Sequence, residues 1–251
     1  MIEKIKIALV SYYNTLPFLY GIQRDVDLMN TVSLRLEYPS KCADLLKSGE
    51  VDLSLVPVIE IPNIPQANII GDYCIGSVGK VNTVMLYSDI PIENIRSIAL
   101  DYQSRTSIML VKVLAKYFWG IDVEYKETSE GYIDAISGSE AGVVIGDRTF
   151  DLNNTFAYQY DLSEEWQKFT GLPFVFACWV SSKPQTVCFQ KQFNSALEFG
   201  LSQKESSIEA FSNIESNRNS LKEYLNENIS YPFDAQKKEA LKKFLSLAQT
   251  I

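Results

Sequence analysis

The sequence contains no histidine among its 251 residues. This absence excludes Ser-His-Asp and Cys-His nucleophilic catalysis, and it excludes metal sites built on imidazole. Cysteine is sparse as well, and the four that are present form no C-x-x-C pair: Cys42, Cys74, Cys178 and Cys188. Since their surroundings are mostly apolar, we expect them to be reduced, buried core thiols of a cytosolic protein.

Positive charge is also scarce. The chain has 23 lysines and arginines against 31 aspartates and glutamates, its formal net charge is −8, and no basic run occurs. Nucleic acids and anionic membrane surfaces are therefore not expected as partners. The same negative balance disfavours a dianionic ligand at long range. Any anion site must then be built locally, from donors such as Arg105 and from helix N-termini.

Long apolar runs are missing too, because none reaches the roughly 20 residues that cross a bilayer. The N-terminal run is interrupted by Glu3, Lys4 and Lys6 and is too short for the core of a secretory signal. We therefore expect a cytoplasmic protein that does not contact membranes. With 46% hydrophobic and 22% charged residues, the composition is that of a globular chain long enough for one large domain or two lobes.

The chain contains two stretches in which strand and helix patterns alternate. The first predicts strand, helix, strand, helix and strand in this order: 5–10, 15–24, 32–37, 41–47 and 51–58. Two more strands follow at 69–75 and 81–87. The second stretch repeats the same order at 97–100, 104–118, 123–125, 131–137 and 142–145. Each βαβαβ set favours a doubly wound sheet with right-handed crossovers.

The predicted fold is therefore α/β with two lobes, each a doubly wound sheet. A further apolar strand is expected at 174–180, and the tail beyond it is helical. We predict a first lobe of 1–86 completed by 178–251, and a second lobe of 87–177. Two crossing segments with strand character would form a hinge, so the sequence predicts a ligand cleft between the lobes, at the carboxyl ends of the strands.

Two loops with hydroxyl, amide and guanidinium groups follow predicted strands and open predicted helices. The first covers residues 11–17 and holds Tyr13, Asn14 and Thr15, and the second covers residues 101–107 and holds Arg105. A helix N-terminus offers free N–H groups and a partial positive charge, which suits an anion. Arg105 adds a planar set of donors matched to a carboxylate. Together they predict a small anionic ligand.

Each of these residues also has a purely structural interpretation. Asn14 could cap the following helix, the 104–107 segment could be an ordinary helix start, and Arg105 could be a solvated charge. Asp101 could order its own loop or pair with Arg105. The segment around Ser77 could be a plain turn, and Ser40 and Asp147 carry a similar ambiguity.

Six segments together resemble a known family: 11–17, 46–52, 75–81, 101–107, 145–148 and 166–177. In this order and spacing they are similar to the chorismate dehydratases, the first enzymes of the futalosine route to menaquinone. The resemblance covers about residues 5 to 181. A sister family with the same fold, dihydroxynaphthoate synthase, uses a histidine, so the histidine-free chain favours the dehydratases.

The resemblance implies a type-II periplasmic-binding-protein-like fold without export. It also implies conversion of chorismate to 3-[(1-carboxyvinyl)oxy]benzoate by loss of water, with no metal or organic cofactor. The implied catalytic residues are Asn14 and Asp147. The implied substrate-binding residues are Tyr13, Thr15, Ser40, Ser77, Ser104, Arg105, Thr106 and Ser107.

The identity of the base is left open by the sequence. Without histidine, it must be a protein carboxylate, another unusual group or a carboxylate of the substrate itself. A second function on the same fold also stays open: a cytosolic binding or sensor protein that takes up a small organic acid and catalyses nothing.

Overall fold

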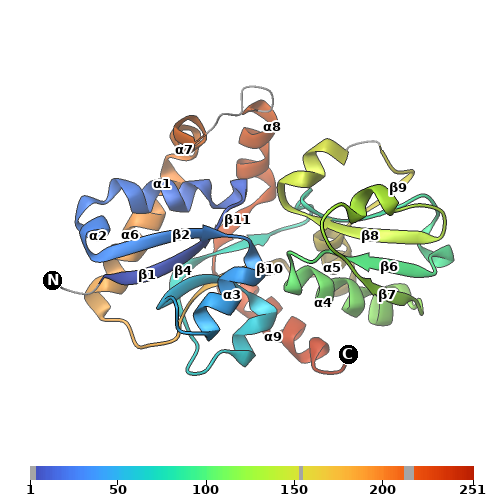
Figure 1. The fold of residues 1–251 in the computed structure, drawn as a ribbon, viewed down its shortest axis with the longest axis horizontal. Helices are drawn as coiled ribbons and strands as arrows, with labels where there is room; N and C mark the ends of the chain where they lie inside the picture. The colour runs from blue at the N-terminus through green and yellow to red at the C-terminus, as the bar shows by residue number, and fades with distance from the viewer. Residues whose placement is uncertain (1–3, 153–154, 212–217) are drawn as a thin grey trace. The chain divides into compact units, whose positions relative to one another are not determined.

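The computed structural model describes residues 4–152, 155–211 and 218–251. By its internal contacts the chain forms two compact units, and both are drawn as ribbons in Figure 1. Unit 1 consists of Met1–Ile75 and Ala177–Asp234, and unit 2 of Gly76–Phe176 and Ala235–Ile251. Each unit thus combines two separate stretches of the chain.

The sheet of unit 1 has the strand order β11-β4-β10-β3-β1-β2. β1 pairs in parallel with β2 and β3, and β10 runs antiparallel to β3. Every residue of β3 is buried, as expected for an apolar strand that is covered on both faces. The strands are β1 (Ile5–Val10), β2 (Val32–Glu37), β3 (Leu53–Pro57), β4 (Asn68–Ser77), β10 (Phe174–Ser181) and β11 (Ser230–Pro232).

Two of the helices of unit 1 cross backbone to backbone. A Cβ added at Gly21 of α1 would lie 1.9 Å from the Ala196 carbonyl oxygen of α6, and one at Gly200 would lie 1.8 Å from the Pro17 oxygen. Glycine is therefore required on both sides of this contact. The helices of unit 1 are α1 (Leu16–Arg24), α2 (Val26–Thr31), α3 (Pro39–Lys47), α6 (Val187–Ser202), α7 (Lys204–Phe211) and α8 (Arg218–Glu223).

The sheet of unit 2 has the order β7-β6-β8-β5-β9. β6 pairs in parallel with β7 and β8, and β5 runs antiparallel to β8 and β9. The pairing pattern of unit 1 thus recurs. In each sheet one strand, β1 or β6, lies between two parallel neighbours, and the neighbour β3 or β8 pairs on its other side with an antiparallel strand, β10 or β5. The elements are β5 (Val84–Ser88), β6 (Ser97–Leu100), β7 (Glu124–Glu127), β8 (Glu140–Ile145), β9 (Tyr158–Asp161), α4 (Arg105–Leu114), α5 (Leu162–Thr170) and α9 (Ala235–Ala248).

The division into units differs from the expected lobes of 1–86 with 178–251 and of 87–177. Residues 76–86 fall into unit 2, because β5 pairs with β8 and β9. Helix α9 also falls into unit 2. Its Phe244 packs edge-on against Trp166 and Phe174, with ring centroids 5.9 and 5.0 Å apart.

Several expected elements have the expected bounds, and others do not. β1, β2 and β6 begin and end where the sequence pattern places them. The segment 131–137, expected as a helix, holds only the 3₁₀ helix Tyr132–Ala135, flanked by the positive-φ residues Gly131 and Gly138. Strands β9 and β11 and helix α2 were not predicted.

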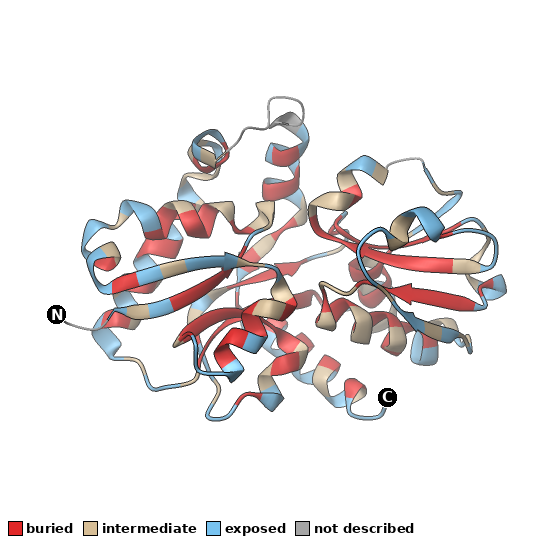
Figure 2. Cartoon of the chain, viewed as in Figure 1, coloured by how far each residue is buried: buried red, intermediate tan, exposed pale blue. Residues whose placement is uncertain are grey.

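Figure 2 shows that buried positions occupy strands of both sheets. Burial also separates the cysteines into two groups. Cys42, Cys74 and Cys178 are free, buried thiols, as expected. Cys188 is free but exposed, so its expected burial is wrong. It lies in the first turn of α6, while the α6 residues that do pack inward include Phe189 and Phe193. In the described part of the chain, no helix has both the length and the apolar composition that a membrane crossing requires.

Candidate functional site

The first predicted loop follows β1 and turns directly into α1. A 3₁₀ helix, Tyr13–Thr15, connects the two, and the Ser11 amide donates to the Glu37 carbonyl at the end of the neighbouring strand β2. Thr15 fixes the turn, because its hydroxyl lies 2.6 Å from the Val10 oxygen and 2.8 Å from the Tyr12 oxygen. The structure therefore uses the Thr15 hydroxyl within the loop.

Asn14 is held from two sides by tyrosines of the C-terminal part of unit 1. The Tyr231 hydroxyl donates to the Asn14 backbone oxygen at 3.0 Å, and the Asn14 amide nitrogen donates to the Tyr224 hydroxyl at 3.4 Å. Among the described residues, the buried amide oxygen Oδ1 of Asn14 has no hydrogen-bond partner. Because buried polar atoms are normally bonded, this oxygen is a candidate ligand contact.

Tyr13 and Ser40 lie, like Asn14, in segments that follow neighbouring parallel strands of unit 1. Tyr13 is half-buried in the 3₁₀ helix, and Ser40 is buried in the first turn of α3. Since β1 and β2 are parallel neighbours, the loops that follow them lie at the same edge of the sheet. Unit 1 thus brings together Tyr13, Asn14, Thr15 and Ser40.

The second predicted loop joins β6 to α4, and its hydroxyls have partners within the protein. Ser104 is the N-cap of α4: its Oγ accepts from the Ser107 amide at 3.1 Å and donates to the Ser107 Oγ at 2.8 Å. The Thr106 hydroxyl donates to the Phe176 oxygen at 3.2 Å. Arg105 is the first residue of α4 and is half-buried. These hydroxyls are hydrogen-bonded at the start of α4. Arg105 supplies the positively charged side chain at this helix start.

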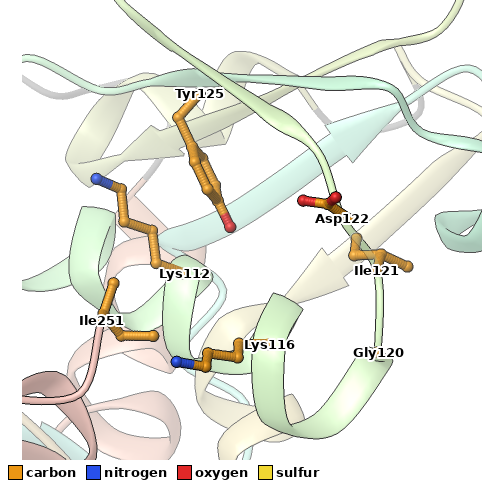
Figure 3. A pocket seen from close by; sticks show the side chains of 7 residues that line it. All are labelled: Lys112, Lys116, Gly120, Ile121, Asp122, Tyr125 and Ile251. Atoms are coloured by element: carbon orange, nitrogen blue, oxygen red, sulfur yellow. The ribbon is translucent and has the colours of Figure 1, made fainter.

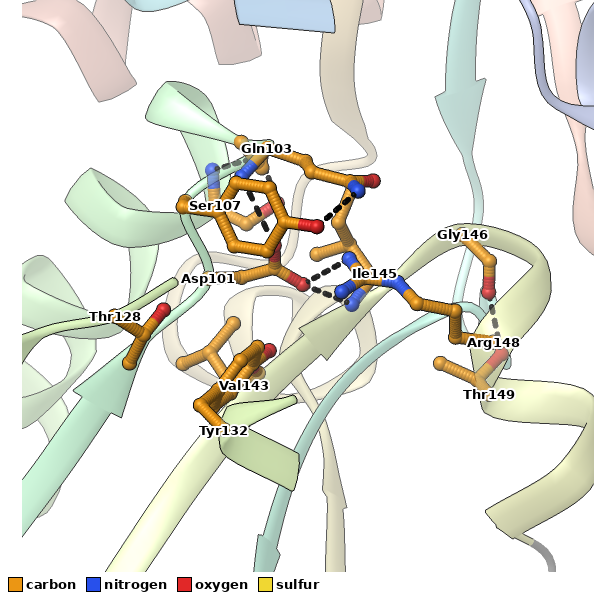
Figure 4. Close-up of polar contacts among 12 residues, drawn as sticks. Asp101, Gln103, Ser107, Thr128, Tyr132, Val143, Ile145, Gly146, Arg148 and Thr149 are labelled. Carbon is orange, nitrogen blue, oxygen red and sulfur yellow. Dashed lines mark hydrogen bonds and ion pairs between the residues drawn. The ribbon is translucent and has the colours of Figure 1, made fainter. Parts of the chain in front are cut away.

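Asp101 orders this loop and pairs with Arg148, a residue to which the sequence assigned no role. The carboxylate is fully buried and accepts from the Gln103 amide at 3.0 Å, from the Ile145 amide at 2.9 Å and from the Arg148 guanidinium at 2.5 Å. Figure 4 shows Asp101 joined by dashed lines to Ile145 and Arg148. The ion pair therefore ties the end of β6 to the end of β8.

Two tyrosines surround this ion pair. The Arg148 guanidinium lies over the Tyr102 ring, 5.7 Å from its centroid. Burial, together with the nearby negative charge of Asp101, raises the pKa of Tyr132 well above its usual value. The Tyr132 hydroxyl donates to the Val143 carbonyl oxygen and thus stays a donor.

Asp147, the second predicted catalytic residue, directly precedes Arg148. It is half-buried in the 3₁₀ helix Gly146–Leu152 that follows β8. Gly146 adopts a φ of 70°, which glycine accommodates without strain, and its amide donates to the Thr83 oxygen at 2.9 Å. Because β6 and β8 are parallel neighbours, unit 2 brings Asp147 to the same sheet edge as the 101–107 loop.

Ser77 ends β4 and is fully buried. Its hydroxyl is hydrogen-bonded to that of Ser163 in the first turn of α5. The glycine before it is required by space rather than by a positive φ, since a Cβ at Gly76 would lie 2.6 Å from the Phe174 oxygen. Ser77 thus anchors α5 rather than presenting an unbonded hydroxyl.

A sequence model of the menaquinone biosynthesis family matches residues 5–250. The chain belongs to this family. It is 30% identical to a chorismate dehydratase of Thermus thermophilus over 159 residues, which are 56% of this chain and 58% of that relative. The alignment therefore spans little more than half the length of the curated relative.

Solved structures show the fold of this family member. A protein from Archaeoglobus fulgidus superimposes with a TM-score of 0.77 at 15% identity, covering 98% of this chain and 97% of its own. The periplasmic aliphatic sulphonate binding protein of Escherichia coli superimposes with a TM-score of 0.64 at 12% identity, covering 99% and 92%. The fold is thus periplasmic-binding-protein-like and α/β, with two β-sheets, as expected.

Sequence reasoning missed Asp161, the N-cap of α5 in this family member. Its buried carboxylate accepts four backbone N–H groups, from Val81 at 2.8 Å, Asn82 at 2.7 Å, Ser163 at 3.0 Å and Glu164 at 3.2 Å. Burial raises the pKa of Asp161, and these hydrogen bonds oppose the rise. The Asp-x-Ser-Glu spacing at 161–164 was the available signal for this cap.

Lys237 of α9 was also missed. It is 1% exposed, and its stem packs over Gly76, where an added Cβ would lie 3.0 Å from the lysine Cε. Lysine is almost never fully buried unless its charge has a partner. One of the four lysines of an amphipathic helix gave no sequence signal of its own.

One pocket lies in unit 2, at the end of α4 (Figure 3). Its volume is about 460 Å³, and none of the predicted site residues lines it. The lining residues are Lys112, Lys116, Gly120, Ile121, Asp122, Tyr125 and Ile251. Within the described residues, no group of three or more Cys, Asp and Glu side chains is arranged to hold a metal ion.

Proposed function

We propose that the protein is a hydro-lyase that removes water from chorismate and forms 3-[(1-carboxyvinyl)oxy]benzoate in the futalosine route to menaquinone. The match to the menaquinone biosynthesis family over residues 5–250 carries this proposal. The Thermus thermophilus relative supports the substrate, since it is a chorismate dehydratase. A location in the cytoplasm stays a prediction of the same proposal.

The reaction is thermodynamically favourable, because its product is aromatic. One ring hydrogen of chorismate is activated through the diene by the ring carboxylate. Its removal, with departure of the neighbouring hydroxyl, gives the benzoate and one water. The protein must bind two carboxylates and orient the leaving hydroxyl, and a base must take the proton.

Asn14 fits the task of orienting the hydroxyl. Its buried Oδ1 is an acceptor without a partner in the described part of the chain, and a substrate hydroxyl is a donor. Two hydrogen bonds already hold the rest of this residue, so its amide is organised before substrate arrives.

Arg105 fits the task of binding a carboxylate. It opens α4, where the helix N-terminus and the guanidinium both favour an anion. Asp147 is the proposed protein carboxylate for the proton transfer, and a carboxylate of chorismate is the other candidate. The hydroxyls of Thr15, Ser77, Ser104, Thr106 and Ser107 are bonded within the protein, so we propose that they shape the site and leave direct recognition to other groups.

The test is to incubate purified protein with chorismate, with a chelator present and no cofactor added. The expected result is a benzoate-type ultraviolet spectrum and a product whose mass is lower by one water. Tight binding of chorismate without any product would favour the binding or sensor protein instead. Absence of both binding and turnover would contradict the proposed substrate.

A further inference from the structure

Two tyrosines far along the chain contact Asn14. Tyr224 lies 210 residues beyond it and Tyr231 lies 217 residues beyond it. Both are buried, at 2% and 3% exposure. They belong to the C-terminal part of unit 1, where the sequence shows helical periodicity and no recognisable motif.

Tyr231 fixes the backbone of Asn14. Its ring packs edge-on against Phe18, with centroids 5.3 Å apart, and the Lys204 ammonium lies 5.1 Å from its centroid. Burial raises the pKa of Tyr231 well above its usual value, so the hydroxyl stays protonated. A protonated hydroxyl is the donor that the Asn14 carbonyl oxygen accepts from, at 3.0 Å.

Tyr224 fixes the side chain of Asn14. It begins a π-helical turn, Tyr224–Asn228, directly after α8. Such turns are rare and recur at functional sites, because they move one side chain out of the regular helical spacing. The Tyr224 hydroxyl accepts from the Asn14 amide nitrogen, and this bond decides which end of the amide is held.

The consequence is an amide with one end bonded and the other end open. With the nitrogen on Tyr224, Oδ1 is buried and has no partner in the described residues. An acceptor in this state is suited to a hydroxyl donor and not to a developing negative charge.

We propose that Tyr224 and Tyr231 are positioning residues that hold the Asn14 amide with Oδ1 turned toward the substrate hydroxyl. This inference rests on the proposed dehydration of chorismate. The two tyrosines touch Asn14 and act on the reaction through it.

The first experiment measures turnover of Tyr224→Phe and Tyr231→Phe, which keep the rings and remove the hydroxyls. We expect kcat to fall by roughly 2- to 12-fold, the scale of one neutral hydrogen bond, while KM stays within about twofold. Tyr20→Phe is the matched control, because Tyr20 also belongs to unit 1 but packs its ring against Phe199. Its kcat should equal that of wild type.

The same substitutions in an Asn14→Ala background separate positioning from a general structural role. If the tyrosines act through Asn14, they lower kcat by less than about twofold once Asn14 is gone. An equal loss in both backgrounds would overturn the proposal, and so would unchanged kcat in the single variants. If Tyr231→Phe fails to fold, the Tyr224→Phe cycle decides alone.

A second readout does not need turnover. The side-chain amide signal of Asn14 in an ¹⁵N NMR spectrum is identified by its loss in Asn14→Ala. It should shift in Tyr224→Phe and stay in place in Tyr20→Phe. A wild-type enzyme that does not dehydrate chorismate would overturn the proposed function. An Asn14 signal that Tyr224→Phe leaves unshifted would overturn the positioning, whatever the activity.

Discussion

At the scale of single residues, most candidate hydroxyls of the site have structural partners. Thr15, Ser77, Ser104 and Thr106 are bonded to backbone or to other side chains within the protein. Short polar side chains at strand-to-helix turns favour such local bonds, and sequence alone does not tell a cap from a ligand contact. Asn14 differs, because its amide oxygen is buried and unbonded among the described residues.

Arg105 carries the first prediction at this scale. Arg105→Ala should weaken chorismate binding by roughly 1.5–3 kcal/mol, the value of a charge-assisted hydrogen bond. The physical reason is that a guanidinium at the start of α4 supplies local positive charge in an acidic protein. Isothermal titration calorimetry gives the affinity. Arg96→Ala, at an exposed position of the same unit, is the control and should bind as wild type does. Equal affinity of Arg105→Ala and wild type would assign Arg105 to the solvated surface.

At the scale of helices and strands, the sequence predicted best those strands whose side chains follow a regular pattern. β1, β2 and β6 have the expected bounds because their side chains follow simple apolar or alternating patterns. β9 was missed because all four of its residues are polar or aromatic, and three of them are exposed or partly exposed at a sheet edge. β11 has only three residues, and its place beside β4 depends on a partner strand far away in sequence. Tyr231 lies on this strand, so its contact with Asn14 had no local signal.

The crossing of α1 and α6 carries the second prediction. Gly21→Ala should destabilise the protein by about 3 kcal/mol or more, at the upper end of the cost of overpacking. The added Cβ meets a backbone oxygen, which cannot move as a flexible side chain would. Urea unfolding measures the loss. Ser195→Ala on the exposed face of α6 is the control and should change stability by less than about 0.5 kcal/mol. A Gly21→Ala variant as stable as wild type would show that the two helices separate easily.

The link between β1 and the start of β3 carries a prediction on pH. Partial burial raises the pKa of Asp52, but hydrogen bonds from the Lys6 amide and the Lys183 ammonium, both at 3.0 Å, outweigh it and leave the pKa below its usual value. Since the unfolded chain then binds the proton more readily, this stabilisation is present above about pH 4 and is lost as pH falls through the folded pKa.

Unfolding between about pH 5 and about pH 3 measures this effect. Asp52→Asn should lose less stability than wild type over this interval, because it has no carboxylate to protonate. Asp27→Asn, at an exposed position of α2, should follow the wild-type curve. Parallel curves for Asp52→Asn and wild type would contradict the depressed pKa.

At the scale of the whole chain, each unit is completed by a segment from the other end of the sequence. The repeated strand–helix alternation predicted two α/β units, and the structure has two sheets. The alternation did not predict that α9 belongs to unit 2. The apolar face of an amphipathic helix shows that the helix packs against a surface, but not which surface. That assignment depends on the contacts of Phe244 with Trp166 and Phe174.

Phe244→Ala tests this assignment. Phe244 is 1% exposed, so its truncation should cost about 3–5 kcal/mol. Amide hydrogen exchange locates the loss, and protection should fall in α4 and α5 of unit 2 while β1–β3 of unit 1 keep theirs. Lys243→Ala, at an exposed neighbouring position, should leave exchange unchanged. Loss of protection confined to unit 1 would contradict the observed division.

The central claim is that the protein dehydrates chorismate with Asn14 orienting the leaving hydroxyl. It is tested most directly by the kcat of wild type and of Asn14→Ala, with the product identified by mass spectrometry. We expect one 3-[(1-carboxyvinyl)oxy]benzoate for each chorismate consumed by wild type. In Asn14→Ala, kcat should be lower by about 10²-fold, the scale of losing one preorganised hydrogen-bonding group. Equal kcat in the two proteins, or no product from wild type, would contradict the claim.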